Sequence, residues 1–303
     1  MIDTFFYSAK GRSFFLYEQI FHNKISKKIF IKIFVIIFLH CFQKNYYLCS
    51  PKIKQFNMRR ATTNIMIISG LVWLASIILP DRLGIDIVRY LGLHYWRSDF
   101  FNPFQLVTYI FMHDTSSFSH IFFNMFGVWM FGRMLEEVWG TRKFVFFYLL
   151  AGVGAGIVQE LTWMIDLSQL TSDFNTAIST NSGESLYGYQ SLLASGDITT
   201  ANAEDLINLR QQLFDRYVTV GASGALFGIL LAFGWLFPET RMFLLFIPIP
   251  IPSRIFVAIY AIVELVLGVV GPMDGIAHFA HLGGMLFGAI ILYIWKKQGK
   301  LYR

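Results

Sequence analysis

The sequence predicts an all-α membrane protein, built as a bundle of six transmembrane helices. Three observations predict this fold class. Hydrophobic residues make up 55% of the 303-residue chain and charged residues only 15%. The mean hydropathy is +0.53, far above that of soluble globular proteins. Six windows approach the roughly 20 apolar residues that cross a bilayer, and they lie at 62–79, 119–138, 144–164, 217–237, 253–271 and 276–295.

Basic residues flank the predicted spans on one side and set their expected orientation. They stand at the two termini and at the turn between the second and third spans: Arg59, Arg60, Arg133, Arg142, Lys143, Lys296, Lys297, Lys300 and Arg303. Because Lys and Arg are enriched in cytoplasmic loops, we expect both termini inside. The same residues account for the net charge of +6, so no nucleic-acid partner is expected.

The long polar loop at 166–216 is expected on the outer side of the membrane. Seven acidic residues stand there against two arginines, which is typical of the side that lacks positive charge. Leu206, Leu209 and Leu213 recur at helical spacing, so segment 203–216 is predicted to form an amphipathic helix. The loop either guides substrates or is a tolerated insertion, and we favour the insertion.

The first 57 residues are rich in Phe, Ile, Lys, Asn and Tyr, unlike the rest of the chain. Met58, directly before Arg59, offers a cytoplasmic start to the first span. We therefore expect residues 1–57 to arise from a misassigned translation start, with a seventh helix as the alternative. Residues 58–303 are then expected to form one membrane domain.

Three reactive side chains are predicted to lie at one depth in the bundle. The second, fourth and sixth spans all run inward from the outer side. His120 opens the second, Ser223 lies about six residues into the fourth, and His281 about five residues into the sixth. At about 1.5 Å per residue, these positions fall roughly 0–10 Å below the outer surface. The topology would therefore place these three residues, which are far apart in the sequence, at the same depth in the membrane.

The combination of Ser223 and His281 indicates nucleophilic chemistry. An imidazole that takes the proton of a serine hydroxyl makes its oxygen nucleophilic. Patterns of small residues that let helices approach closely accompany both: Gly224-x-x-x-Gly228 and Gly284-x-x-x-Gly288. Taken alone, Ser223 would be interpreted as a packing residue. Asp274 lies about 10 Å along a helix from His281, too far to orient it, so a Ser–His dyad is predicted.

His278 and His281 raise a second possibility, a zinc site, because residues at i and i+3 share a helix face. Zinc sites take three or four protein ligands, however, and no third ligand is evident in the sequence. Cys41 and Cys49 supply neither a metal motif nor a disulfide framework. We therefore expect no metal and no organic cofactor. His278 is expected nearer the surface and rotated by about 300° from His281.

Four motifs in this order resemble the rhomboid intramembrane serine proteases, over most of residues 62–295. They are His120-x-x-x-Asn124, Gly132-x-x-x-Glu136-x-x-x-Gly140, Gly221-Ala222-Ser223-Gly224 and Ala280-His281-x-x-Gly284-x-x-x-Gly288. The resemblance implies a rhomboid-like bundle of six transmembrane helices. It also implies that Ser223 is the nucleophile and that His281 acts first as general base and then as general acid.

The resemblance assigns supporting roles as well. His120 and Asn124 would donate hydrogen bonds to the developing oxyanion, together with the Ser223 backbone N–H. Small and aromatic residues would shape the site around the dyad: Gly221, Gly224, Phe227, Gly284 and Gly288. Glu136, about 24 Å along its helix from His120, is expected to anchor the turn into the third span through backbone N–H groups or through Arg133 and Arg142.

The chain departs from the family's pattern in its first outer loop. Many members carry a Trp-Arg pair where this chain has Phe104-Gln105, although Trp96-Arg97 stands eight residues earlier. The polar anchoring of this loop is therefore left open. Glu264 is an isolated acidic residue in the fifth span, and the sequence assigns it no partner.

The functional prediction is an intramembrane serine protease that cuts membrane-anchored proteins near the outer end of their transmembrane helix. Its expected partners are transmembrane protein substrates and the lipid bilayer, and its expected location is a cell (inner) membrane. A non-catalytic relative stays open as an alternative, although such relatives typically lose the serine or the histidine that this chain keeps. A solute transporter would need inverted repeats and broken helices, for which only Pro248, Pro250 and Pro252 give a hint.

Overall fold

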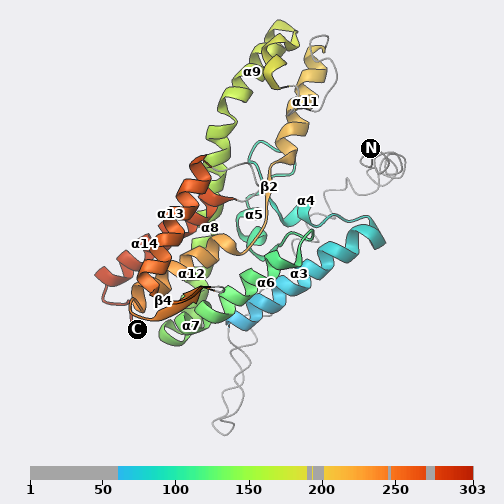
Figure 1. Cartoon of the computed structure of the whole chain (residues 1–303). Coiled ribbons are helices and arrows are strands. Elements are labelled where there is room, and N and C mark those ends of the chain that lie inside the picture. The colour runs from blue at the N-terminus through green and yellow to red at the C-terminus, as the bar shows by residue number, and fades with distance from the viewer. Residues whose placement is uncertain (1–60, 190–192, 194–200, 245–246, 271–276, 303) are drawn as a thin grey trace.

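A computed structural model describes the chain at residues 61–189, 193, 201–244, 247–270 and 277–302 (Figure 1). The expectations for the N-terminal 57 residues, for the basic and cysteine residues within the first 60, and for Asp274 lie outside the described residues. The described residues form a largely helical protein with two small sheets.

Within the part of the chain that the structure describes, four helices are long and apolar enough to cross a membrane. They are α3 (Ala61–Leu83), α8 (Thr141–Asp166), α13 (Ser253–Val270) and α14 (His278–Lys297). Each coincides with one of the predicted apolar windows to within a few residues. A multispan helical membrane protein is therefore the observed fold class.

The two remaining windows are helical but differ from uninterrupted spans. The second contains α6 (Phe118–Gly127), a π-helical segment η3 (Val128–Gly132) and α7 (Arg133–Trp139), which follow one another without a gap. The fourth contains α12 (Ser223–Leu236), an apolar helix of only 14 residues. The count of six transmembrane helices therefore stays a prediction.

The fourth helix begins later than the sequence predicts. The apolar window starts at residue 217, whereas α12 begins at Ser223 itself. The preceding residues form β2 (Val218–Thr219), which pairs antiparallel with β1 (Leu93–His94). Gly221 then turns the chain with φ +136°, a conformation that residues with a Cβ rarely adopt. Strand pairing and this turn determine where α12 begins, and a hydropathy window detects neither of them.

Helix α12 is central and contacts α6, α8, α13 and α14. Glycines permit its closest approaches. A Cβ on Gly284 would overlap the Gly224 carbonyl oxygen, and one on Gly228 would lie 2.7 Å from the Ala151 Cβ. A Cβ on Gly288 would lie 3.3 Å from the Gly228 Cα. The two glycine patterns thus face each other, and α12 and α14 pack backbone to backbone.

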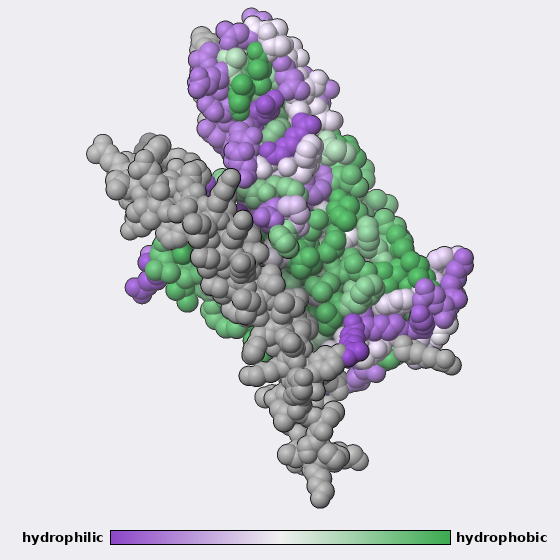
Figure 2. All heavy atoms as spheres, turned by 180° about the vertical axis from the view of Figure 1, so that it is seen from behind, coloured by the Kyte–Doolittle hydropathy of each residue, from purple (hydrophilic) through white to green (hydrophobic). Residues whose placement is uncertain are grey.

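The outer surface of the bundle is apolar. On α13, Ile262, Val269 and Val270 are 61%, 69% and 78% exposed. Figure 2 shows apolar residues covering the bundle and polar residues covering the extension at its upper end. Soluble monomers rarely expose apolar surface on this scale, whereas helices with such faces are stable in lipid. The protein is therefore an integral membrane protein.

The polar loop folds as a small helical extension with its own core. Helices α9 (Ser168–Thr180), η4 (Gly183–Tyr189) and α11 (Ala203–Arg216) form it, and α9 and α11 project together from the bundle (Figure 1). The predicted amphipathic helix is confirmed, since Leu206 and Leu213 are buried and Leu209 packs against the same core. Asn202 starts α11 with a capping box, which satisfies N–H groups at the helix start.

The loop between α3 and α6 is anchored by Gln105, one of the two residues at which the sequence departs from the family's pattern. The loop contains the short helices α4 (Val88–Leu91), α5 (Gln105–Thr108) and η2 (Tyr109–Phe111). The Gln105 side chain is buried, accepts hydrogen bonds from the His94 and Asn102 backbone N–H groups, and donates to the Phe100 carbonyl at 2.8 Å. An amide thus holds this loop through backbone groups.

The prolines that hinted at a broken helix lie in a β-hairpin. Strand β3 (Arg241–Leu244) pairs antiparallel with β4 (Ile247–Pro252), which leads directly into α13. The prolines fall between the apolar windows 217–237 and 253–271, and the pairing of strands there follows from no pattern in the sequence. The hairpin connects α12 and α13, so no membrane helix is broken there.

Glu136 ties the first helix to the second. Its carboxylate accepts hydrogen bonds from the Ala61 and Thr62 backbone N–H groups at 2.7 and 3.1 Å and from the hydroxyls of Thr62 and Thr141. An anion at the first residues of a helix satisfies N–H groups that have no partner within the helix. The backbone N–H partners thus belong to the first helix, and the Thr141 hydroxyl is the contact at the turn into the third span where partners were expected. Arg133 lies 3.7 Å from Glu137 instead.

Candidate active site

Ser223 lies at the first position of α12, on the wall of a cavity. The Gly221 N–H donates to the Tyr109 carbonyl at 3.0 Å, which fixes the turn to η2. Because Ser223 begins the helix, its own N–H lacks a partner within the helix. The serine is only partly buried, so its hydroxyl is accessible from the cavity.

His281 comes from the third position after the start of α14 and reaches Ser223. Its Nε2 lies 2.9 Å from the Ser223 Oγ, a normal hydrogen-bond length. The Phe227 ring, one turn further along α12, stacks on the imidazole with 4.3 Å between centroids and 9° between planes. Ser223 and His281 both lie near the N-terminal ends of their helices, where glycines hold α12 and α14 close together. The structure therefore brings together the serine and histidine that the sequence predicted as a pair.

Glu264 has two partners, contrary to its description in the sequence analysis as an isolated residue. Its Oε2 lies 2.9 Å from the His281 Nδ1 and 2.7 Å from the His278 Nδ1. Sequence reasoning missed this because the carboxylate is on α13, 17 residues before His281, and helix packing alone aligns the two. The available signal was an acidic residue within an apolar span, which needs a partner there.

His278 also differs from its expected position. It is the first residue of α14, three residues before His281, but it was not expected to share a contact with His281. It is only 6% exposed and bonds the same carboxylate oxygen as His281. A rotation of about 300° equals about 60° in the other direction, so residues at i and i+3 share a face. Both imidazoles can therefore reach the same carboxylate on α13.

His120 and Asn124 lie on α6 beside the same cavity. The His120 Nδ1 accepts a hydrogen bond from the Asp114 N–H at 3.3 Å, so its Nε2 carries the ring proton in the neutral form. A Cβ placed on Gly221 would lie 3.1 Å from that Nε2 and 3.6 Å from the Ser223 Oγ. The absence of a side chain at Gly221 thus leaves room between the imidazole and the serine. Asn124 donates to the His120 carbonyl at 2.8 Å.

The cavity that contains these groups has a volume of about 1010 Å³. Polar walls come from His120, Asn124, Ser223 and His281, and apolar walls from α6, α12 and α13. Val218, Thr219 and Val220 also line it, so β2 and the residue that follows it form one wall. An extended peptide with apolar side chains is the kind of ligand that such a site can hold.

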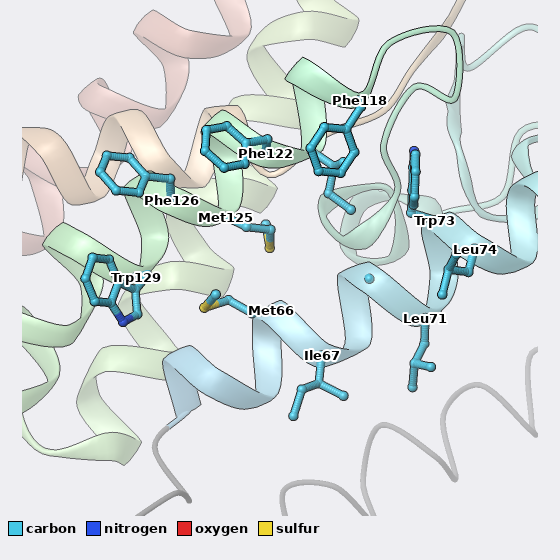
Figure 3. A pocket seen from close by; sticks show the side chains of 12 residues that line it. Met66, Ile67, Leu71, Trp73, Leu74, Phe118, Phe122, Met125, Phe126 and Trp129 are labelled. Atoms are coloured by element: carbon cyan, nitrogen blue, oxygen red, sulfur yellow. The ribbon is translucent and has the colours of Figure 1, made fainter. Parts of the chain in front are cut away.

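A second cavity, of about 530 Å³, lies between α3 and α6 and is apolar throughout. Figure 3 shows Met66, Leu74, Phe122 and Trp129 around it. None of the predicted site residues lines it, so the reactive groups gather in the larger cavity.

Glu264, His278 and His281 offer three metal-ligand atoms within 4.8 Å of one another, so a third candidate ligand exists that the sequence did not reveal. The two N···O separations of 2.7 and 2.9 Å are hydrogen-bond lengths. Ligands of a tetrahedral zinc ion, each about 2.1 Å from the metal, lie about 3.4 Å apart. The spacing therefore fits hydrogen bonds between the carboxylate and the two imidazoles better than a shared metal ion.

His113, in the loop before α6, is a buried histidine that the sequence analysis did not consider. Its ring packs edge to face on His120 with 5.3 Å between centroids. Burial lowers the pKa of His113 to about 3, with a further contribution from the His120 charge. The residue is therefore neutral at physiological pH and supports the position of the His120 ring.

Comparison with known proteins agrees with this architecture. The sequence profile of the Rhomboid domain matches residues 95–165 and 196–298, which include His120, Ser223 and His281. The chain is similar to Rhomboid protein 1, mitochondrial, of Saccharomyces cerevisiae, with 30% identity over 180 residues. That alignment covers 56% of this chain and 49% of the yeast protein, so the chain spans about half the length of this relative. With the profile matching more than half of its length, the chain belongs to the rhomboid family.

Proposed function

We propose that the protein is an intramembrane serine protease that hydrolyses a peptide bond of a membrane-anchored protein. The observation that carries this proposal is the 2.9 Å contact between the Ser223 Oγ and the His281 Nε2 at the wall of a large cavity. A non-catalytic relative would have no need of this geometry, because binding alone requires no nucleophile beside a base.

In the first step the Ser223 hydroxyl attacks the scissile carbonyl while His281 takes its proton at Nε2. The carbonyl oxygen becomes negative in the resulting tetrahedral intermediate. His281 then gives the proton to the leaving amine, and the acyl-enzyme forms. Water activated by the same imidazole releases the second product.

Three donors converge on the place where the oxyanion develops. The Ser223 N–H lies at the N-terminus of α12, where the helix dipole also favours negative charge. The His120 Nε2 proton can be donated through the space that the missing side chain of Gly221 leaves open. Asn124 donates one amide hydrogen to the His120 carbonyl, and its second amide hydrogen is available to the oxyanion. Donors held in place before the reaction stabilise such charge most effectively.

Substrate helices approach from the lipid and are cut near one membrane surface. Ser223 lies only four residues beyond the end of β2, so the site is shallow and water can reach it. The acidic α9–α11 extension stands at this end of the bundle (Figure 1). With basic residues at the opposite side, the cut falls within about two helical turns, roughly 10 Å, of the outer boundary. The cell (inner) membrane stays our expected location, although the yeast relative is named as mitochondrial.

The test compares cleavage of a model transmembrane substrate by the purified full chain and its variants in proteoliposomes. Ser223→Ala and His281→Ala should each abolish turnover while the protein stays folded, because each removes one half of the proton-transfer pair. Ser69→Ala is the matched control, since Ser69 is fully buried in α3 and outside the cavity. Retained turnover in Ser223→Ala contradicts the serine mechanism, and mass spectrometry of the released product locates the cut.

A further inference from the structure

We propose that Glu264 is a positioning residue that orients His281 for proton transfer, so that the site works as a Ser223–His281–Glu264 triad instead of the dyad the sequence predicted. The inference rests on the proposed protease function. It concerns how the imidazole is held and not which residue attacks the substrate.

Hydrogen bonding fixes the tautomer of His281. A carboxylate oxygen accepts hydrogen bonds and donates none. The contact of 2.9 Å between the Glu264 Oε2 and the His281 Nδ1 therefore places a proton on Nδ1. The opposite nitrogen, Nε2, is then the unprotonated one, and it faces the Ser223 Oγ at 2.9 Å. This is the tautomer that a general base for serine requires.

His278 fixes the carboxylate in turn. Its Nδ1 lies 2.7 Å from the same Glu264 Oε2, so that oxygen accepts two N–H groups at once. Gly268, one turn after Glu264 on α13, makes room for this: a Cβ there would lie 3.3 Å from the His278 Cβ. The carboxylate thus keeps its place when the His281 imidazole gains or loses its proton.

Glu264 is an acidic residue that faces inward from an otherwise apolar helix. Neighbouring side chains such as Val263 and Leu265 are 45% and 50% exposed on the outer face of the bundle, whereas Glu264 is 8% exposed and turned inward. A carboxylate inside a membrane protein is costly unless it is paired. Among the described residues, the hydrogen bonds of Glu264 go to the two histidines, and one of these contacts the serine.

The positioning role of Glu264 also follows from the charge that the His281 imidazole gains during the reaction. During attack on the substrate, His281 carries a positive charge, and a carboxylate at 2.9 Å stabilises that charge in the transition state. A group that only pinned α13 to α14 would contribute equally before and during the reaction. The proposal therefore predicts a loss in kcat without a matching loss in KM or in folding.

The experiment measures kcat, KM and thermal midpoint for Glu264→Gln, Glu264→Asp and the control Glu136→Gln, in the full chain reconstituted in liposomes. Labelling of Ser223 by a fluorophosphonate probe gives a second readout of nucleophilicity. Glu264→Gln should lower kcat and the labelling rate by about 10²–10⁴-fold, the scale seen when the orienting carboxylate of a serine-protease triad becomes an amide, with KM changed less than about threefold. Glu264→Asp keeps the charge and should recover part of that loss.

His278→Gln supplies an intermediate case, because Glu264 keeps its contact with His281 but loses the donor that holds it. Its kcat should lie between those of the wild type and Glu264→Gln. Glu136→Gln should lower the thermal midpoint and leave kcat per folded molecule unchanged, since Glu136 bonds the start of α3 outside the cavity.

Wild-type kcat in Glu264→Gln overturns the proposal, as does a loss that only follows the fraction of unfolded protein. If Glu264→Gln does not fold, Glu264→Asp decides: reduced kcat at unchanged KM supports the role, and wild-type kcat overturns it. Failure of the protease proposal looks different, because then the wild type itself shows neither cleavage nor labelling that depends on Ser223.

Discussion

Gly284 on α14 lies so close to Gly224 on α12 that a Cβ on the former would overlap the carbonyl oxygen of the latter. These glycines stand one residue after Ser223 and three residues after His281 on their helices. The hydrogen bond between serine and histidine therefore depends on the distance between two backbones.

Gly284→Ala should separate α12 from α14 and lower turnover together with stability. Forcing a methyl group into a packed interface costs about 1–3 kcal/mol, and the serine–histidine contact lengthens with it. The measurements are the thermal midpoint in detergent and the rate of fluorophosphonate labelling. Gly70→Ala is the matched control, because a Cβ at Gly70 on α3 meets nothing within 4 Å. That control should be neutral or stabilising by about 0.5–1 kcal/mol, and equal effects of the two substitutions would argue against the packing explanation.

Asn124→Ala and His120→Ala should lower kcat more than they raise KM. Their donors meet charge that exists mainly in the transition state, and the loss of one oxyanion donor costs about 10²–10³-fold in kcat. The Asn124 variant should keep more activity, because the Ser223 N–H and His120 remain. Steady-state kinetics on a transmembrane substrate separates the two constants. An effect confined to KM would mean that these residues only line the substrate path.

Glu136→Ala should reduce stability and leave the chemistry of the folded protein intact. The substitution removes the acceptor of the Ala61 and Thr62 N–H groups and of the Thr141 hydroxyl, and each buried donor left unpaired costs about 1–3 kcal/mol. Glu137→Ala is the control, since Glu137 is about half exposed and pairs with Arg133 at the surface, where ion pairs contribute little. A Glu136 variant with wild-type thermal midpoint but no activity would contradict this role.

Stability should fall as the pH drops from about 6.5 toward 5, partly because of His113. Burial lowers the pKa of His113 to about 3, whereas the unfolded chain titrates near the ordinary value of about 6.5. Between these values the unfolded state binds more protons, so the free energy of unfolding rises with pH and is lost as the pH falls. Burial lowers the pKa of His94 as well, which acts in the same direction.

The measurement for this prediction is the thermal midpoint of the wild type and of His113→Gln at pH 7.5, 6.5, 5.5 and 5.0, values chosen about the reference pKa. The variant should show a smaller decrease over this range, because one buried group that resists protonation is gone. Asp114 beside it stays ionised throughout, since hydrogen bonds from Ser116 lower its pKa. Parallel curves for the two proteins would show that His113 contributes nothing to the pH dependence.

Hydropathy and local spacing determined a large part of this protein. Runs of apolar residues located α3, α8, α13 and α14 to within a few positions, because a helix that meets lipid must be apolar along its length. Leucines at helical spacing located α11 in the same way. The glycines around Ser223 and His281 predicted a close contact between their helices. The common direction of the fourth and sixth spans predicted that the two residues lie at the same depth in the membrane.

Tertiary structure alone decided the contacts that do not follow from a local pattern. The start of α12 at Ser223 depends on strand pairing between residues more than 100 positions apart, and the hydrogen bonds of Gln105 depend on the path of the first outer loop. Glu264 meets His281 only because α13 packs on α14 with one particular rotation about its axis. The sequence shows which polar side chains need a hydrogen-bond partner inside a membrane. Which partner satisfies each of them depends on helix packing, which forms between segments that are distant in the chain.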